Sequence, residues 1–467
     1  MLWFILAVGF GVRLLGAWNG TLKYDESTHL TCAETIDLRP QYFHLVFRSV
    51  DHPLLSVYVL RLSGYLFGDS NFGLRILHVL FGTLTLIPIF FLGKKVFSEE
   101  AGLWAAALLA VDQFHQIWSY FAVEEILLLF FATLVLLQFL RAMESKTRGD
   151  FLTLGVLLGF AYLAKETAII LIAVLWLCVL IDPKLRPMIR NPLWYLAQGV
   201  ALLIALPDIL WNFFNYYEGF FYRDVGLMSE TVGISSRALR LYLGEITHDL
   251  TGGPHTPSVS HWPAGLLYLG ASIGAWPLRR DWRVQVLMIV FLSFFLFFTF
   301  VPARASNAWW WGSISLLPAV IFAGNAMDRF AAGAWSRDAT GVWGRLPEVM
   351  AVMFVCYLGL NAVFTGLKTG IGAPRRSAAQ LVKEVLADAQ RASTSKEMFA
   401  LDWRLMHTLH ITGPNPDLYA YLARVAYERK QIKRAEYFVH RSLALDASNQ
   451  LAFATARLIG ATKTTVR

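Results

Sequence analysis

Two pairs of adjacent carboxylates lie next to long apolar runs of the sequence. Asp25 and Glu26 follow the first run, and Glu124 and Glu125 stand directly before the fourth. Two carboxylates held in one cleft repel each other, which raises the proton affinity of one of them and suits it to act as a general base. Solvated acids have no such role, and acids in the first turn of a helix also interact favourably with its dipole. Both pairs are therefore candidates for acid–base or cation-binding chemistry, with a structural role open for each.

Two basic side chains stand where apolar runs end. Lys165 lies between two runs that are separated by almost no loop, and Arg304 precedes Trp309-Trp310-Trp311. A cation at the membrane surface can bind a phosphate through charge-assisted hydrogen bonds. It can equally anchor a helix at the lipid headgroups, and Lys165 can pair with Glu166. Both interpretations stay open from the residues alone.

Three histidines lie in polar segments between the runs. His52 precedes Pro53 in the first of these segments, and His255 and His261 lie in a later one that is rich in glycine and proline. An imidazole can bind a metal ion or transfer a proton near neutral pH, although a lone histidine more often has a structural role. Each of His255 and His261 could therefore be a ligand of a divalent metal ion or an acid–base group. Such a metal ion is the only cofactor that these residues suggest.

The positions of all these residues depend on apolar runs that are long enough to cross a membrane. Of the 467 residues, 56% are hydrophobic and 16% are charged, and the mean hydropathy is +0.49. Soluble domains carry about 25% charged residues, whereas a membrane-spanning helix needs about 20 mostly apolar ones. The sequence therefore predicts an all-α integral membrane protein with about eleven transmembrane helices and external loop helices. The expected spans are residues 2–18, 76–92, 101–117, 126–140, 151–164, 167–181, 193–210, 263–278, 284–301, 308–327 and 349–367.

Lysine and arginine are concentrated in every second loop between these spans. With a cytoplasmic N-terminus, the basic inner loops are 94–95, 141–148, 184–190, 279–283 and 329–345. Cytoplasmic loops carry such an excess, so topology explains the formal charge of +8 and a nucleic acid partner is not expected. Two long loops, 19–75 and 211–262, then lie outside. The amphipathic piece 53–67 within the first of them is expected to lie along the membrane interface.

The composition changes after Leu367, which divides the chain into a transmembrane domain, 1–367, and a non-cytoplasmic helical domain, 368–467. The last segment is charged and contains no further apolar run. Within it, 417–453 is similar to a tetratricopeptide repeat, with a generic helical hairpin as the alternative. Small or apolar residues occupy the packing positions of such a repeat, namely Leu422, Ala423, Ala435 and Ser442. Helical repeats make concave binding surfaces, so we expect a protein partner at this domain.

The order of the motifs along the chain carries a resemblance to a known family. The matching segments are Arg13 before Asp25-Glu26, then His52-Pro53-Leu54, Leu66-Phe67-Gly68, Leu74-Arg75-Ile76, Gly93–Phe97, Ser119–Leu129, Gly159–Lys165, and Arg304 ahead of Leu317-Pro318. In this order they resemble the polytopic glycosyltransferases of the C-type fold, in particular the protein O-mannosyltransferases and the lipid A aminoarabinose transferases. Three positions depart from the family pattern: Leu54 replaces a second proline, Tyr120 a frequent arginine and Glu166 a frequent glycine.

The resemblance implies transfer of a sugar, with inversion, from a polyprenyl-phosphate-linked donor to a hydroxyl acceptor. By that analogy Asp25 is the catalytic base, with Glu26 beside it in the pocket. Proton transfer of this kind contributes about 10²–10⁴-fold to a rate. Lys165 and Arg304 would bind the carrier phosphate and favour its departure as an anion.

The same resemblance implies a substrate site for the remaining candidates. These are Glu124, Glu125, His52 and Arg75 as substrate-binding residues, with His261 and His255 as possible metal ligands. Glu125 matches the second acidic motif of the family, and it or Glu124 would bind a cation or the acceptor. The acceptor would be a protein, a lipid or a glycan. The expected location is the bacterial inner membrane, with the active site facing the periplasm or the exterior.

Two other classes of protein fit parts of the sequence. A transporter usually carries charged groups near the bilayer midplane and repeats in its two halves, whereas the charges here lie at span ends and no internal repeat is visible. A non-catalytic membrane scaffold would recruit partners through the C-terminal domain, but it leaves the acidic, His-Pro and lysine motifs without a role. The enzyme is therefore the first hypothesis, and the scaffold is the alternative.

Overall fold

The structure is a computed structural model that describes residues 1–19, 26, 29–30, 33, 53–68, 70–215, 242, 245–246, 259–260, 262–300, 313–332, 346–371, 378–392, 395–412 and 414–465. The chain forms two compact units. The first comprises Met1–Asn19, Asp51–Ser56 and Arg75–Ile371, and the second comprises Gly20–Val50, Val57–Leu74 and Gly372–Arg467. The domain boundary expected at residue 367 remains a prediction.

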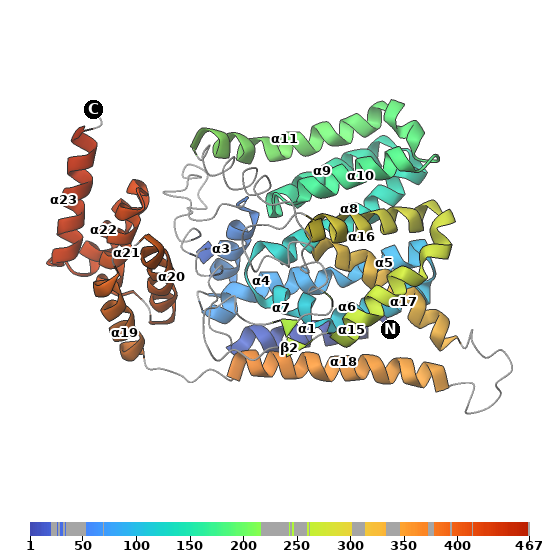
Figure 1. The fold of residues 1–467 in the computed structure, drawn as a ribbon, viewed down its shortest axis with the longest axis horizontal. Helices are drawn as coiled ribbons and strands as arrows, with labels where there is room; N and C mark the ends of the chain where they lie inside the picture. Colours follow the sequence, from blue (N-terminus) through green and yellow to red (C-terminus); the bar gives the residue numbers. More distant parts are fainter. Residues whose placement is uncertain are drawn as a thin grey trace. The chain divides into compact units, whose positions relative to one another are not determined.

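The first unit is an assembly of long, closely packed helices (Figure 1). Its helices are α1 (Leu2–Asn19), most of α4 (Asn71–Leu84), α5 (Leu86–Val96), α6 (Glu99–Val111), α7 (Gln113–Tyr120), α8 (Glu124–Ser145), α9 (Arg148–Ala164), α10 (Ala168–Ile181), α11 (Pro192–Asn215), α15 (Trp262–Gly274), α16 (Trp282–Phe300), α17 (Leu316–Ala331) and α18 (Leu346–Ile371). The first unit also contains two short 3₁₀ helices, η2 (Arg186–Arg190) and η5 (Trp276–Arg280). Its two-residue strands β1 (Glu245–Ile246) and β2 (Val259–Ser260) pair in an antiparallel manner.

The helices account for the apolar runs of the sequence. Five helices in the described part are long and apolar enough to cross a membrane: Asn71–Val96, Glu124–Ser145, Pro192–Leu210, Trp282–Phe300 and Leu346–Leu367. The run 101–117 was expected to be one span, but the structure divides it into α6 and α7 at Asp112. The protein is thus a multi-pass membrane protein, and the number of spans remains a prediction.

Small residues let the helices of this unit approach closely. A Cβ atom on Gly93 of α5 would lie 2.8 Å from the Cα of Gly102 on α6, which is closer than real side chains come. Without a hydrophobic driving force between helices in lipid, such van der Waals contacts supply much of the association. The glycines therefore fix α5 and α6 as immediate neighbours.

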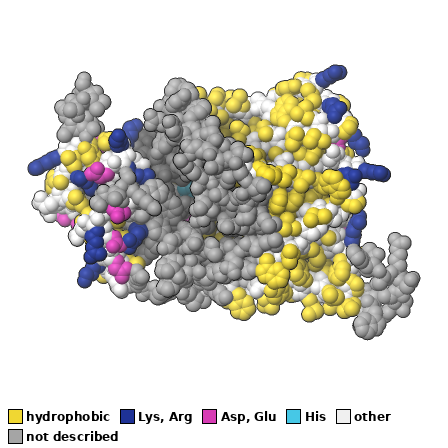
Figure 2. Space-filling view, in the orientation of Figure 1, with side chains coloured by type: hydrophobic (Ala, Val, Ile, Leu, Met, Phe, Trp, Pro, Cys, Tyr) yellow, Lys and Arg dark blue, Asp and Glu magenta, His cyan; other side chains and the backbone are white. Residues whose placement is uncertain are grey.

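Charged residues of the predicted inner loops meet at one end of the first unit. Lys94 pairs with Glu99, and Glu144 pairs with Lys95 and with Arg283, whose Nε lies 2.8 Å from Glu144 Oε1. Figure 2 shows lysine and arginine side chains at this end, beyond a broad hydrophobic surface of the helices. Residues of three of the predicted basic loops, 94–95, 141–148 and 279–283, therefore lie together, which agrees with their assignment to one side of the membrane.

The second unit contains most of α3 (Leu55–Phe67) and a set of C-terminal helices. These are α19 (Ala378–Arg391), α20 (Ser395–Thr412), α21 (Pro416–Glu428), α22 (Ile432–Leu445) and α23 (Gln450–Thr465). Asn415 begins α21 by accepting hydrogen bonds from the N–H groups of Asp417 and Leu418, at 3.0 and 3.1 Å. Lys430, with a φ of 61°, lets the chain reverse between α21 and α22.

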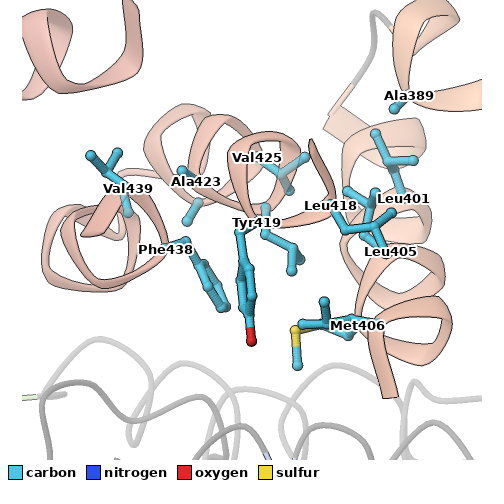
Figure 3. Close-up of a cluster of buried hydrophobic side chains, with 14 of the residues drawn as sticks. Ala389, Leu401, Leu405, Met406, Leu418, Tyr419, Ala423, Val425, Phe438 and Val439 are labelled. Carbon is cyan, nitrogen blue, oxygen red and sulfur yellow. The ribbon is translucent and has the colours of Figure 1, made fainter. Parts of the chain in front are cut away.

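The C-terminal helices share a hydrophobic core. Figure 3 shows Tyr419 of α21 beside Phe438 of α22, with Leu405 and Met406 of α20 also in the cluster. The predicted packing positions Leu422, Ala423, Ala435 and Ser442 are all fully buried. The C-terminal helices are therefore observed, while their status as a separate domain and their assignment as a tetratricopeptide repeat remain predictions.

Candidate functional site

The hairpin of α8 and α9 brings sequence-distant charged residues to one end of the first unit. After α8, Lys146 adopts a left-handed conformation with a φ of 54°. Thr147 then caps α9, because its side-chain oxygen accepts the N–H of Asp150 at 3.3 Å. The tight reversal makes the two helices antiparallel neighbours. The first turn of α8 therefore lies beside the residue that follows α9.

Those residues are Glu124 and Glu125 on α8 and Lys165 after α9. The Nζ of Lys165 lies 2.9 Å from Glu124 Oε1 and 2.5 Å from Glu125 Oε1. The three side chains are between 2% and 6% exposed, so the cluster is buried. The structure thus joins three of the residues that the sequence put forward separately, and we name them the acid–lysine cluster.

The acid–lysine cluster carries one positive and two negative formal charges. Buried charges are costly unless they are paired and hydrogen-bonded, and here the ammonium is shared between both carboxylates. The sequence had left an ion pair with Glu166 open as one interpretation of Lys165; in the structure both glutamates of α8 bind its ammonium. The excess negative charge suits the cluster to receive a cation or the proton of a hydroxyl group.

A second polar group lies where α6 ends and α7 begins, and the sequence analysis missed it. All eight residues of α7 are buried. Asp112 precedes this helix and accepts the N–H of His115 at 2.7 Å with Oδ1 and the hydroxyl of Tyr268 at 3.0 Å with Oδ2. Asp112 stands inside a run counted as one span, and an aspartate followed by polar residues is the signal of a new helix N-terminus.

The other predicted site residues are placed only in part. Glu26 is 1% exposed and Arg75 of α4 is fully buried. One turn after Arg75, the Nε2 of His78 lies 3.3 Å from the Oγ of Ser56. Five candidates lie outside the described residues: Asp25, His52, His255, His261 and Arg304.

A metal site is not assembled by the residues that the structure describes. Among them, no group of three or more histidine, cysteine, aspartate or glutamate side chains is placed to hold a metal ion. The two glutamates of the acid–lysine cluster already share an ammonium. The divalent metal ion expected with His261 or His255 therefore remains a prediction.

Comparison with known proteins gives this arrangement a context. Residues 51–211, which include the acid–lysine cluster and Arg75, match the family model described as dolichyl-phosphate-mannose-protein mannosyltransferase. An undecaprenyl phosphate-alpha-4-amino-4-deoxy-L-arabinose arabinosyl transferase of Edwardsiella ictaluri is 27% identical over 46% of this chain and 43% of its own length. The lipid A galacturonosyltransferase RgtD of Rhizobium johnstonii is 22% identical over 45% of this chain and 37% of its own. The matched part spans less than half of these relatives.

Solved structures match over most of the chain. ArnT from Cupriavidus metallidurans bound to undecaprenyl phosphate is 15% identical and covers 97% of this chain and 77% of its own, with a TM-score of 0.55. The archaeal oligosaccharyltransferase AglB from Archaeoglobus fulgidus, in complex with an inhibitory peptide and a dolichol-phosphate, is 14% identical and covers 85% of this chain and 58% of its own, with a TM-score of 0.52. The predicted resemblance is therefore confirmed, and the chain has the fold of the polytopic membrane glycosyltransferases of the C type.

Proposed function

We propose that this protein is a membrane glycosyltransferase that moves a sugar from a polyprenyl-phosphate-linked donor to a hydroxyl acceptor on the non-cytoplasmic face. The observation that carries the proposal is the likeness, over 97% of the chain, to a structure whose bound molecule is undecaprenyl phosphate. The acid–lysine cluster supports it, because it lies in the segment that matches the mannosyltransferase family model. The proposed setting is the bacterial inner membrane, with the site facing the periplasm.

The orientation follows from the two ends of α8. Its last turn carries Glu144, which pairs with Lys95 and Arg283 among the basic loops, and its first turn carries Glu124 and Glu125. If the basic loops face the cytoplasm, the acid–lysine cluster faces the opposite side. A donor with a lipid tail and a phosphate head would then meet its site at the outer membrane face.

The proposed reaction is a single inverting displacement. The acceptor oxygen attacks the anomeric carbon, the bond between that carbon and the carrier phosphate oxygen breaks, and the phosphate leaves as an anion. Asp25 takes the proton of the attacking hydroxyl, a step worth about 10²–10⁴-fold, and Glu26 lines the same pocket. Arg304 and Lys165 bind the departing phosphate, whose charge they stabilise.

The contacts of Lys165 add a second task to this proposal. Its ammonium is shared between Glu124 and Glu125, so it fixes both carboxylates in place, and it offers charge to a phosphate only when a cation or a proton offsets the net negative charge of the cluster. We assign the oriented glutamates to the acceptor or to a cation that accompanies it. Arg75 and His52 complete the substrate-binding set, and His261 or His255 would be the ligands of a divalent metal ion if one is used. No step of the displacement depends on that metal.

The acceptor is a protein, a lipid or a glycan, and the C-terminal helices are proposed to help select it. Their surface has a cavity of about 730 Å³ lined by residues of α19, among them Val382, Lys383 and Leu386, and by Asn415 at the start of α21. Helical repeats present binding surfaces of this kind. A variant truncated after Gly370 should therefore lose acceptor use while it still inserts into the membrane.

The proposal is tested by transfer from radiolabelled polyprenyl-phosphate sugars with purified protein and crude membrane extract as acceptor. Asp25→Asn should lower the rate of transfer about 10²–10⁴-fold. Asp281→Asn is the matched control, because Asp281 belongs to a basic loop, where it accepts the N–H of Arg283 at 2.9 Å, and an asparagine oxygen can do the same. Equal transfer by wild type and Asp25→Asn would show that the base is wrongly assigned. If neither wild type nor either variant consumes any donor, the alternative function takes precedence. That alternative is a membrane scaffold that recruits partners through its C-terminal helices.

A further inference from the structure

Arg13 of α1 is fully buried in the first unit, and its guanidinium is bound on every side. Its N–H groups donate to Ser119 Oγ (3.0 Å), to the carbonyl oxygens of Gly9 (2.8 Å), Ala110 (2.9 Å) and Leu109 (3.1 Å), and to His115 Nδ1 (2.7 Å). A guanidinium has five N–H donors, and these contacts use all of them. A buried arginine is costly in a membrane domain, and the reaction proposed above gives Arg13 no role, so its position requires an explanation.

The acceptors show what Arg13 holds together. Helix α6 ends just before Asp112, so the carbonyls of Leu109 and Ala110 belong to its last turn and have no partner within the helix. Arg13 supplies that partner and places a positive charge at the negative end of the helix dipole. Asp112 does the converse for α7, because its carboxylate accepts the N–H of His115 in the first turn. The break between the two helices is therefore capped on both sides.

The ring of His115 makes the contact with Arg13 specific. Arginine can only donate hydrogen bonds, so His115 Nδ1 must accept in their 2.7 Å contact. The imidazole is therefore neutral, with its proton on Nε2. An amide oxygen at the place of Nδ1 could accept the same hydrogen bond, whereas a hydrocarbon side chain could not.

Other helices hold α7 from further sides. The Nε2 of Gln116 donates to the carbonyl of Ala362 on α18 at 2.9 Å. A Cβ atom on Gly82 of α4 would lie 2.2 Å from Ser119 Oγ, so the backbone of α4 touches the side chain that Arg13 also binds. These contacts leave α7 little freedom to rotate or shift without moving its neighbours.

Helix α7 leads into α8 through residues 121–123 alone, so its placement sets where the first turn of α8 begins. We propose that Arg13 is a positioning residue of the transfer site: by joining the end of α6 to α7 it fixes the entry into α8, and with it the carboxylates of Glu124 and Glu125. This inference rests on the proposed function, which assigns these glutamates to the acceptor. A misplacement of about 1 Å in such a site can cost about 10²-fold in rate.

The kinetic test compares Arg13→Met and His115→Leu with the conservative variant His115→Asn. The first two should lower kcat/KM for the acceptor about 10²-fold, while the donor KM changes little. His115→Asn keeps an acceptor for the guanidinium and should retain most of the activity. In a Glu125→Gln background Arg13→Met should add little further loss, because the group that it positions is already altered. The control is Ser98→Ala, which removes the cap at the opposite end of α6, where Ser98 Oγ accepts an N–H at 2.9 Å.

Three kinetic results would overturn the inference. Arg13→Met could have wild-type kinetics, or the two His115 variants could have equal effects. In the third, the loss in kcat/KM of Arg13→Met would be as large in the Glu125→Gln background as in wild type. A measurement without substrate keeps it testable if the proposed function fails. Amide hydrogen exchange of residues 113–127 should rise about tenfold or more in Arg13→Met over wild type, and not in Ser98→Ala. If wild type transfers no sugar but exchange rises in this segment, only the proposed function is wrong; unchanged exchange there would overturn the inference itself.

Discussion

Removal of the ammonium from the acid–lysine cluster should be among the most destabilising single changes in the membrane unit. Lys165 is the group that both Glu124 and Glu125 share, at 2.9 and 2.5 Å, and all three side chains are almost fully buried. Lys165→Met keeps most of the volume and removes the charge. The cluster then changes from a net formal charge of −1 to −2, with two carboxylates left next to each other.

The expected cost follows from that geometry. Breaking a buried ion pair by removal of one partner costs about 3–5 kcal/mol, because a buried charge loses its compensation. The double variant Lys165→Met/Glu125→Gln returns the cluster to −1 and should recover at least about 1 kcal/mol of that loss. Lys94→Met is the matched control: its partner is Glu99, the two side chains are 46% and 55% exposed, and such surface pairs contribute about 0.2–1 kcal/mol.

The assay is unfolding of the purified variants in the same detergent, followed by tryptophan fluorescence against denaturant concentration. The free energy of unfolding should fall much further for Lys165→Met than for Lys94→Met, with partial recovery in the double variant. If the two single variants cost the same, the buried ion pairs do not stabilise the fold. If the double variant is less stable than Lys165→Met by the full cost of Glu125→Gln, the two residues are not coupled and the reasoning is refuted.

Three further changes probe the packing and the C-terminal helices. Gly82→Ala should destabilise the membrane unit by about 1–3 kcal/mol, seen as a lower unfolding midpoint, because the new methyl group would lie 2.2 Å from Ser119 Oγ. Asp402→Asn should loosen the C-terminal helices by about 3 kcal/mol, read from amide exchange in α20 to α22, because the carboxylate binds Arg434 at 2.7 and 2.8 Å while both side chains are less than 10% exposed. Asn415→Ala should cost about 1 kcal/mol, with faster exchange confined to the first turn of α21, because it removes the cap of that helix. A wild-type unfolding midpoint would contradict the expectation for Gly82→Ala, and wild-type amide exchange would contradict those for Asp402→Asn and Asn415→Ala.

The apolar runs allowed most of the fold to be predicted, because a bilayer requires long apolar helices with every backbone group paired internally. The break at Asp112 was one exception. A count of apolar residues over 101–117 tolerates one aspartate, whereas the hydrogen bonds of its side chain to α7 and to Tyr268 end one helix and begin another. Capping chemistry, rather than hydrophobicity, decided that boundary.

The candidate site was predicted residue by residue but not as a group. Glu124, Glu125 and Lys165 were each singled out by type and by their place at the end of a span, yet the one ion-pair partner considered for Lys165 was its neighbour Glu166. Their meeting depends on the tight turn at Lys146, whose left-handed backbone makes α8 and α9 antiparallel. An ion pair between neighbouring residues can be predicted from the sequence. An ion pair across a helical hairpin can be predicted only when the packing of its two helices is known.

Arg13 illustrates a different limit. In the sequence, Arg13 stood out only as one of the positions that resemble the family, because a single arginine in an apolar run forms no pattern of its own. Its acceptors are three backbone carbonyls and two polar side chains, and four of these five lie about a hundred residues away on α6 and α7. Only the packing of α1 against those helices gives the residue its role.

The fate of the sugar carrier is the decisive test of the proposed glycosyltransferase. Purified protein is mixed with a panel of radiolabelled polyprenyl-phosphate sugars and membrane extract, and label that leaves the carrier is followed over time for wild type, Asp25→Asn and Asp281→Asn. Wild type and Asp281→Asn should release label from at least one donor into an acceptor, about 10²–10⁴-fold faster than Asp25→Asn. A carrier that stays loaded across the whole panel with wild-type protein would contradict the proposed glycosyltransferase.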